Sequence, residues 1–149
     1  MANIRFLLHF FAVSASTIGA ATPVLPVLAA DRHDAPFPLC SGPGRVTCVV
    51  DGDTIWFHGE KIRIADINAP EVSHPGCDAE LTLGRAATAR LQVLLGAGPF
   101  TLTPAADGRD RDRYGRLLRV ITRDGHSLGD DMVRAGLAEE WQGHRRNWC

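Results

Sequence analysis

The sequence predicts a small α+β domain that is mainly β, with five strands and two helices. Two observations lead to this fold class. Short segments rich in β-branched and aromatic residues are separated by turn dipeptides, which is typical of strands. Two other segments carry apolar residues at helical spacing. The 149 residues suit one domain rather than two.

The first 30 residues are predicted to be a signal peptide that precedes this domain. A short positive start leads into an apolar run that ends in small residues. Cleavage is expected after Ala29 or Ala30, and the second choice is after Ala20 or Ala21. The alternative is an uncleaved membrane anchor, because the run is nearly long enough to span a bilayer. Pro23 and Pro26 argue against that helix. The expected location is periplasmic or secreted.

Residues 31–44, rich in Pro, Gly and Asp, are expected to form a linker into the domain. Three strands then follow, because apolar β-formers alternate with the turn signals Asp-Gly-Asp and Gly-Glu. They are expected at residues 45–50, 54–58 and 61–67. These segments predict a three-stranded meander.

A long helix is expected over residues 79–95, where Leu83, Ala87, Leu91 and Leu94 recur at helical spacing. Gly96 supplies the stop.

Two more strands, over residues 99–104 and 117–122, flank an arginine-rich loop. A second helix over residues 127–136 has Ser127 as its N-cap and Gly136 as its C-terminal stop. Three strands, a helix and two strands follow the order of a five-stranded Greek-key barrel of the OB type. Other small α+β folds also fit this order.

The cysteines are Cys40, Cys48, Cys77 and Cys149, all after the signal peptide. An even number in an oxidising compartment predicts two disulfides, for which three pairings exist. We favour Cys40 with Cys48 and Cys77 with Cys149, because the first pair is close in sequence. A zinc site is the competing interpretation, but the His74-x2-Cys77 spacing lacks a second ligand pair.

The charge of the chain indicates no particular partner. Cleavage after residue 30 removes Arg5 and no acid, which changes the formal net charge from −1 to −2. Nucleic-acid binding therefore cannot be inferred from the overall charge. The charge is uneven, however, since residues 109–123 hold six arginines and two aspartates.

Three polar clusters could carry chemistry. They are Asp51-Gly-Asp53, the group of Arg63, Asn68, Ala69 and Glu71, and the segment Asp112 to Arg116. Alone, each has a structural interpretation: a hairpin turn, a strand-end cap with a salt bridge, and a solvated turn.

Together, these clusters offer the groups that phosphodiester hydrolysis needs. Carboxylate, amide and backbone oxygens bind hard cations, although an EF-hand is excluded because its third ligand and glycine are absent. Two arginines can hold a phosphate while negative charge develops on it. A carboxylate can activate water.

Four segments resemble successive motifs of the staphylococcal (micrococcal) nuclease family, the thermonucleases. They are "VVDGDTIWF", "RIADINAPE", "DRYGR" and "MVRAGLA", in the family's order from about Arg45 to Trp141. The nuclease domain is accordingly expected at residues 45–142, followed by a tail at 143–149. The resemblance implies an OB-fold phosphodiesterase that needs calcium, cuts DNA and RNA with little sequence preference, and leaves 3′-phosphates.

The resemblance also implies roles for the residues that match the motifs. Asp53 matches a calcium ligand, Asn68 falls where a second carboxylate ligand stands, and Ala69 supplies a ligating carbonyl. Arg63 and Arg116 match the two arginines that hold the phosphate in the transition state.

Four further residues have implied roles. Glu71 matches the glutamate that activates or positions the attacking water. Arg113 and Tyr114 match residues that contact a nucleotide phosphate, and Asp51 supports the metal site from behind its ligands.

The sequence departs from the family pattern in two places. Asn68 replaces an aspartate, which predicts weaker calcium binding. Asp66 could restore some charge if the strand continues, but we expect it to form a salt bridge instead. After Trp141 only "QGHRRNWC" follows, so the long C-terminal helix and a nucleotide-binding tyrosine of the family are expected to be missing. Cys149 would then tie down the tail.

The sequence thus predicts an exported, calcium-dependent nuclease that acts on DNA and RNA. We expect a monomer with no stable protein partner and no membrane contact once the signal is cleaved. One alternative is a catalytically weak or inactive nucleic-acid-binding module of the same family. Another is a structural or interaction domain whose arginines form salt bridges.

Overall fold

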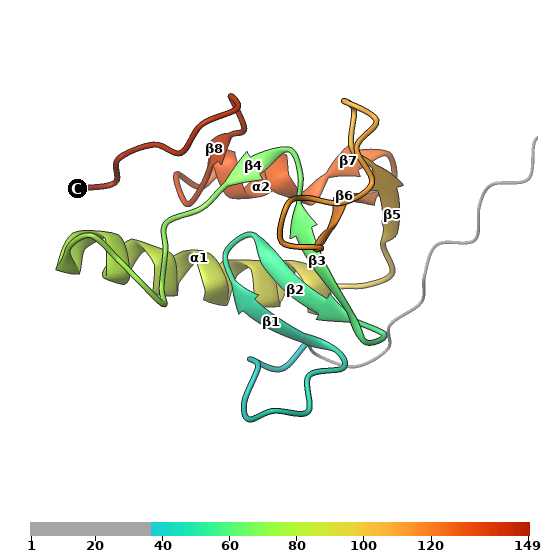
Figure 1. The fold of residues 1–149 in the computed structure, drawn as a ribbon, viewed down its shortest axis with the longest axis horizontal. Coiled ribbons are helices and arrows are strands. Elements are labelled where there is room, and N and C mark those ends of the chain that lie inside the picture. Colours follow the sequence, from blue (N-terminus) through green and yellow to red (C-terminus); the bar gives the residue numbers. More distant parts are fainter. Residues whose placement is uncertain (1–36) are drawn as a thin grey trace, which may run out of the picture.

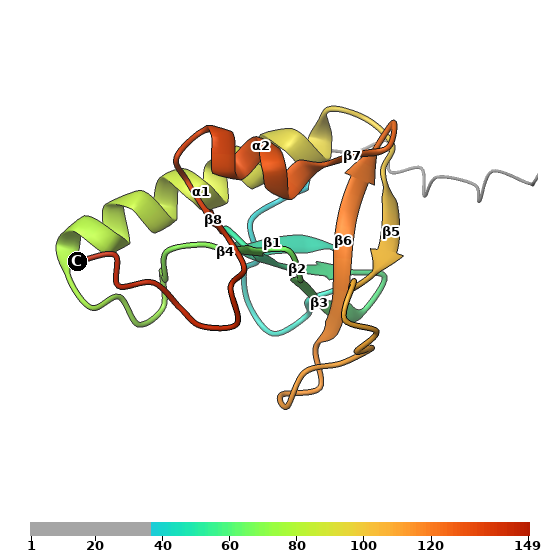
Figure 2. The same ribbon diagram turned by 90° about the horizontal axis from the view of Figure 1, so that it is seen from above.

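The computed structural model describes residues 37–149, so the expected signal peptide and its cleavage site lie outside the described part. Helix α1 (Asp78–Gly96) and helix α2 (Leu128–Arg134) lie on the same side of the strands (Figures 1 and 2). The strands are β1 (Cys48–Asp51), β2 (Thr54–Phe57), β3 (Glu60–Ile64), β4 (Ile67–Asn68), β5 (Thr101–Pro104), β6 (Leu117–Arg123), β7 (His126–Ser127) and β8 (Glu139–Glu140). No helix within residues 37–149 has both the length and the apolar character to cross a membrane.

The main sheet has the strand order β1-β2-β3-β6-β5, and β7 pairs with β6. Strands β3 and β6 are parallel, whereas the other neighbours in this sheet are antiparallel. A closed five-stranded barrel is not confirmed, because within residues 37–149 the end strands β1 and β5 do not pair. The outer edge of β1 is already occupied: Cys40 N–H donates to the Val49 carbonyl, and Val49 N–H donates to the Pro38 carbonyl, both at 2.9 Å.

The strand expected over residues 61–67 is divided in two. β3 ends at Ile64, and β4 leaves the main sheet to pair with β8. At the break, Ala65 N–H bonds to the Arg119 carbonyl at 2.9 Å, while the Asp66 carbonyl accepts from Trp141 N–H at 2.8 Å. The chain therefore turns from one sheet to the other at the segment where the polar cluster begins.

Helix α1 covers the expected residues and buries Ala87, Leu91 and Leu94 against the sheet. Gly84 has no room for a side chain, because a Cβ there would lie 2.8 Å from the Pro70 carbonyl oxygen. The helix is thus pressed directly onto the loop that follows β4.

The packed domain begins before residue 45. Phe37, inside the segment expected to be a linker, is fully buried in the core. Its carbonyl accepts a hydrogen bond from Gln92 Nε2 at 2.6 Å, which joins it to α1.

Both disulfides follow the favoured pairing, Cys40 with Cys48 and Cys77 with Cys149. Helix α2 has the expected cap, since Ser127 Oγ accepts from Gly129 N–H at 2.9 Å.

Candidate active site

The turn between β1 and β2 is held against helix α1. A Cβ on Gly52 would lie 2.7 Å from Ala87 Cβ and 2.8 Å from Ala69 Cβ, so only glycine fits. The turn presents Asp51 and Asp53, and Asp51 Oδ1 accepts from Asp53 N–H at 3.1 Å. The glycine is therefore needed for this close approach to α1.

Asp53 joins three parts of the cluster. Its Oδ2 accepts from Ala69 N–H at 2.9 Å and lies 3.1 Å from Arg63 Nη2. Its Oδ1 accepts from the Thr54 hydroxyl at 3.0 Å. The turn, the arginine of β3 and the segment after β4 are thereby fixed relative to one another.

Arg63 is buried, at 8% exposure, yet it lines a surface pocket. Its Nη1 donates to the Ile67 carbonyl at 2.8 Å and to the Ile64 carbonyl. The guanidinium thus joins the end of β3 to the beginning of β4. Its guanidinium lies 5.7 Å from the ring centroid of Trp141, within cation–π range. These contacts fix the direction of the guanidinium.

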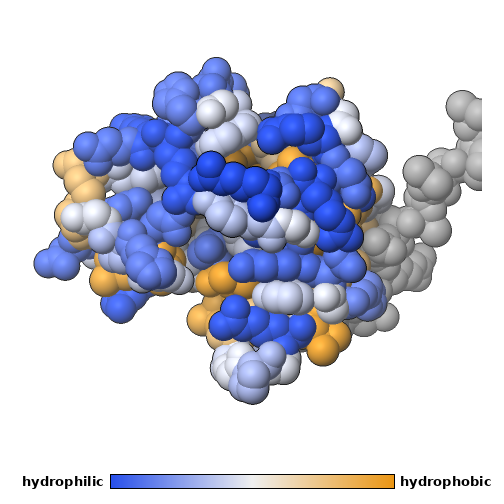
Figure 3. Space-filling model, viewed as in Figure 1, coloured by the Kyte–Doolittle hydropathy of each residue, from blue (hydrophilic) through white to orange (hydrophobic). Residues whose placement is uncertain are grey.

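The pocket that Arg63 lines has a volume of about 580 Å³ and is rich in arginine. Figure 3 shows that hydrophilic residues predominate on the face of the molecule seen in Figure 1. The arginines of the lining are Arg63, Arg109, Arg113, Arg116 and Arg145, whereas its acids are Asp107 and Asp112. A pocket with this lining favours an anion.

Asp112 organises the "DRYGR" loop at the pocket. Its Oδ2 lies 2.6 Å from Arg116 Nε, and its Oδ1 accepts from the N–H groups of Tyr114 and Arg116 at 2.9 Å each. Burial would raise the pKa of Asp112, but the hydrogen bonds from Arg116 and Tyr114 hold it below the ordinary value. Asp112 thus remains ionised and fixes Arg116.

Tyr114 is exposed beside two arginines. The ring centroid lies 4.8 Å from Arg113 Cζ and 5.5 Å from Arg116 Cζ, and Arg113 Nη2 donates to the hydroxyl at 2.7 Å. The structure therefore brings four predicted residues together at the pocket: Arg63, Arg113, Tyr114 and Arg116.

The other predicted residues lie beside the pocket rather than in its lining. Asn68 is 3% exposed, and its Nδ2 donates to Glu139 Oε1 at 3.1 Å. The Glu71 carboxylate pairs with Arg145 Nη1, and Arg145 itself lines the pocket. Glu71 is therefore connected to the pocket through Arg145.

Asp51 has the most perturbed carboxyl group of this cluster. Burial raises its pKa to about 7, and repulsion by Asp53 and by Glu71 adds to that rise. Burial and the two neighbouring carboxylates thus disfavour the ionised form of Asp51.

The oxygen donors in this cluster are of the types that hard cations take. Within residues 37–149 no three His, Cys, Asp or Glu side chains form a metal-binding cluster by themselves. Asp53, Asn68 and the Ala69 carbonyl would supply one carboxylate, one amide and one backbone oxygen, the ligand types of calcium. A divalent cation would also offset the repulsion that raises the Asp51 pKa.

The salt bridge expected for Asp66 is not found among the described residues. Its Oδ2 accepts from the Ser127 hydroxyl at 2.5 Å, next to the N-terminus of α2. At the break between β3 and β4, Asp66 thus accepts a hydrogen bond from the N-cap residue of α2 instead of forming an ion pair.

Sequence reasoning missed Glu80, Glu139, Trp141 and Arg145. The first of these had a signal, since Glu80 stands three residues after the helix N-cap Cys77, the position of the glutamate in a capping box. The others act through contacts between distant segments, which leave no local pattern.

Comparison with known proteins agrees with these motifs. Residues 61–147 match the model of the family described as staphylococcal nuclease homologue. The chain is 33% identical over 93 residues to Endonuclease YncB of Bacillus subtilis (strain 168), covering 60% of this chain and 43% of that protein. It is 34% identical over 93 residues to SPbeta prophage-derived endonuclease YokF of the same strain, covering 60% and 31% respectively.

A third relative has a different description. The chain is 32% identical over 94 residues to Succinoglycan biosynthesis protein ExoI of Rhizobium meliloti (strain 1021), covering 60% of this chain and 48% of that protein. The matched part thus spans less than half the length of each of these three relatives.

Proposed function

The chain belongs to the staphylococcal nuclease homologue family, and on this premise we propose that it is a calcium-dependent nuclease that hydrolyses phosphodiester bonds of DNA and RNA. One observation carries the proposal: Arg63 from β3 and Arg116 from the loop before β6 line the same pocket. The strand path β1-β2-β3-β6-β5 supports an OB-type fold, whose barrel is partly open.

The two arginines hold the phosphate. Arg63 is oriented by Asp53 and the Ile67 carbonyl, and Arg116 is oriented by Asp112. Each guanidinium presents N–H donors to the phosphate oxygens, where negative charge increases in the transition state. Because these groups are fixed in advance, no reorganisation is needed when the charge develops.

The same pocket lining leads us to expect little preference for the base sequence of the nucleic acid. Contacts to phosphates position a nucleic acid but carry no sequence information. Arg113 and Tyr114, exposed at the pocket, contact a neighbouring nucleotide phosphate. The same contacts are available on DNA and on RNA, and the products would carry 3′-phosphates.

Asp53, Asn68 and the Ala69 carbonyl would hold calcium, with Asp51 behind them. Calcium, when bound, supplies positive charge next to the phosphodiester. Glu71 orients the attacking water and accepts its proton, as a general base does.

We further propose that the protein acts outside the cytoplasm, as a monomer without a stable protein partner. The pairing of Cys40, Cys48, Cys77 and Cys149 in two disulfides supports an oxidising compartment. The location is periplasmic or secreted, and an uncleaved anchor is the alternative.

A catalytically weak nucleic-acid-binding module is the second candidate. Asn68 favours it, because an amide replaces a carboxylate and already donates to Glu139. Nicking of a supercoiled plasmid by the purified protein, with calcium or with a chelator, separates the two. Cleavage that needs calcium supports the nuclease, whereas a gel shift without cleavage supports the binding module. If the protein shows neither cleavage nor a gel shift, only a structural role remains.

A further inference from the structure

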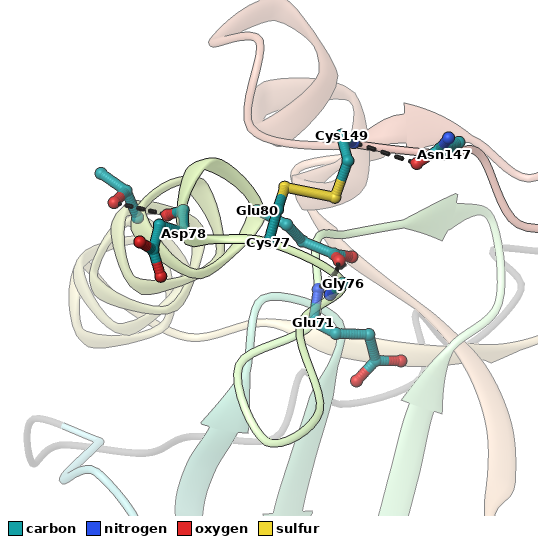
Figure 4. The surroundings of a disulfide bond; sticks show 8 residues. Glu71, Gly76, Cys77, Asp78, Glu80, Asn147 and Cys149 are labelled. Carbon is teal, nitrogen blue, oxygen red and sulfur yellow. Dashed lines mark hydrogen bonds between the residues drawn. A yellow bond between two sulfur atoms is a disulfide. The ribbon is translucent and has the colours of Figure 1, made fainter.

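The tail after β8 returns to the beginning of helix α1. Figures 1 and 2 show the C-terminus beside the first turn of α1, and Figure 4 shows the disulfide between Cys149 and Cys77, the N-cap residue of that helix. The tail therefore closes a covalent loop across the side of the molecule that carries the pocket.

Along this path the tail forms one wall of the pocket. Trp141, Gly143 and Arg145 belong to the pocket lining. Arg145 differs from the other arginines there because its Nη1 pairs with the Glu71 carboxylate. The side chains of Arg145 and Glu71 are 58% and 31% exposed, so an exposed pair of this kind adds little to stability. The pair matters instead for the orientation of the Glu71 carboxylate.

The backbone of Glu71 is fixed from the other side, by helix α1. Its N–H donates to Glu80 Oε1 at 3.1 Å, and Gly76 N–H donates to Glu80 Oε2 at 2.6 Å. A Cβ on Gly84 would lie 2.9 Å from the Glu71 carbonyl oxygen. Figure 4 shows the Glu71 side chain pointing away from α1. The helix therefore fixes the backbone of Glu71 but not the rotamer of its side chain. Among the described residues, Arg145 is the ion-pair partner of that carboxylate.

The position of Arg145 depends in turn on the tail. Residues 141–149 form no regular helix or strand. The tail is attached on the C-terminal side of Arg145 by the backbone N–H of Arg146, 3.0 Å from Glu139 Oε1, and by the disulfide at Cys149. A segment without secondary structure samples more conformations when the disulfide that closes its loop is removed.

We propose that Arg145 is a positioning residue for the nuclease reaction: it orients the Glu71 carboxylate, and the Cys77–Cys149 disulfide holds it there. This inference rests on the proposed function and deepens it, because it gives the short tail a role in the active site. Arg145 acts through Glu71, whereas Arg63 and Arg116 act on the phosphate.

The first test compares Arg145→Gln with Arg146→Gln in calcium-dependent DNA cleavage. Arg146 is the matched control, because its side chain lies over Trp148 and its contact to Glu139 uses the backbone. Arg145→Gln should lower kcat by about ten- to hundredfold with little change in KM, the scale of a misplaced catalytic group. Arg145→Lys should restore part of the rate. An unchanged kcat in Arg145→Gln would overturn the proposal.

The second test repeats the substitution in a Glu71→Gln background. If Arg145 acts by orienting the carboxylate, Arg145→Gln should cause no further loss there. An equal loss in both backgrounds would show that Arg145 acts on the nucleic acid directly, and the proposal would be wrong.

The third test removes the disulfide with Cys77→Ser/Cys149→Ser, and Cys40→Ser/Cys48→Ser serves as the control. Serine is a favoured N-cap, so α1 should be retained, and circular dichroism checks this. Loss of Cys77–Cys149 should lower kcat as much as Arg145→Gln, and the two changes together should cost no more than either. Full additivity would overturn the role of the tether.

These outcomes separate the two proposals. A parent protein that does not cleave DNA with calcium contradicts the proposed function. A parent that cleaves, while Arg145→Gln cleaves equally well, contradicts only the role of Arg145.

Discussion

Arg63 Nη2 lies 3.1 Å from Asp53 Oδ2, and the two side chains are only 9% and 11% exposed. The residue expected to hold the phosphate and the residue expected to bind the metal are therefore joined in one buried ion pair. Such a pair contributes little net stability, but removing one partner leaves the other charge buried and unpaired. The pair also directs the guanidinium toward the pocket.

Asp53→Asn should therefore destabilise the fold by about 3 kcal/mol or more, because it leaves the Arg63 guanidinium without its counter-charge. Glu60→Gln is the matched control, since Glu60 pairs with Arg111 at an exposed position and should have little effect. Urea unfolding of both variants in calcium-free buffer measures the difference. Equal stability of the two variants would contradict the structural role of the buried pair.

Arg63→Lys and Arg116→Lys should each lower the cleavage rate by about a hundredfold or more. Lysine keeps the charge but loses the forked donors that match a phosphate. Arg119→Lys is the control, because Arg119 pairs with Asp110 outside the pocket lining. Initial rates at saturating calcium give the comparison. Near-parental rates for both pocket variants would show that these two arginines do not act on the phosphate.

Asn68→Asp should lower the calcium concentration needed for half-maximal cleavage by about one to two decades, since site affinity depends on the number of charged ligands. Asn68 Nδ2 donates to Glu139 Oε1, however, so an aspartate there would face another carboxylate. The change should therefore be made with and without Glu139→Gln, which supplies a donor again. A calcium titration with an unchanged midpoint in both variants would show that residue 68 is not a ligand.

Asp51 should make stability depend on pH. Its folded-state pKa is raised to about 7, mainly by burial, so the folded protein binds the proton more tightly than the unfolded chain. Stability from this group is then present at low pH and lost as pH rises from about 4 through 7.

Asp51→Asn should remove that loss. One pKa unit corresponds to about 1.4 kcal/mol. Because Asp51 is partly exposed, solvent reduces the effect. We expect the stability of the variant relative to the parent to be greater at pH 8 than at pH 5, by an amount on the order of 1–2 kcal/mol. Urea unfolding at both pH values, without calcium, measures the effect. A parent and variant with parallel pH dependence would show that Asp51 titrates normally.

The sequence predicted most regular elements because their signals are local. Alternation and turn dipeptides located β1, β2 and β6, and helical spacing located α1. The two-residue strands β4, β7 and β8 are too short for periodicity to mark them, so the division of residues 61–67 was not foreseen.

The candidate site, too, could be predicted only in part from local sequence signals. The residues of the four motifs were found because their types and spacing repeat a known pattern. The contacts of Glu71 with Arg145 and of Asn68 with Glu139 join segments about 70 residues apart in the chain. Such contacts are set by the course of the tail and by the pairing of β4 with β8, neither of which a local pattern encodes.

The most direct test of the account is the single-turnover rate of DNA cleavage by Glu71→Gln and by the parent, at the same saturating calcium concentration. Glutamine keeps the size of the side chain and can still accept from Arg145, but it cannot take a proton from water. We expect calcium-dependent cleavage by the parent and a rate about a hundredfold to ten-thousandfold lower for the variant. Equal rates for the two proteins would contradict the assignment of this site as the catalytic centre.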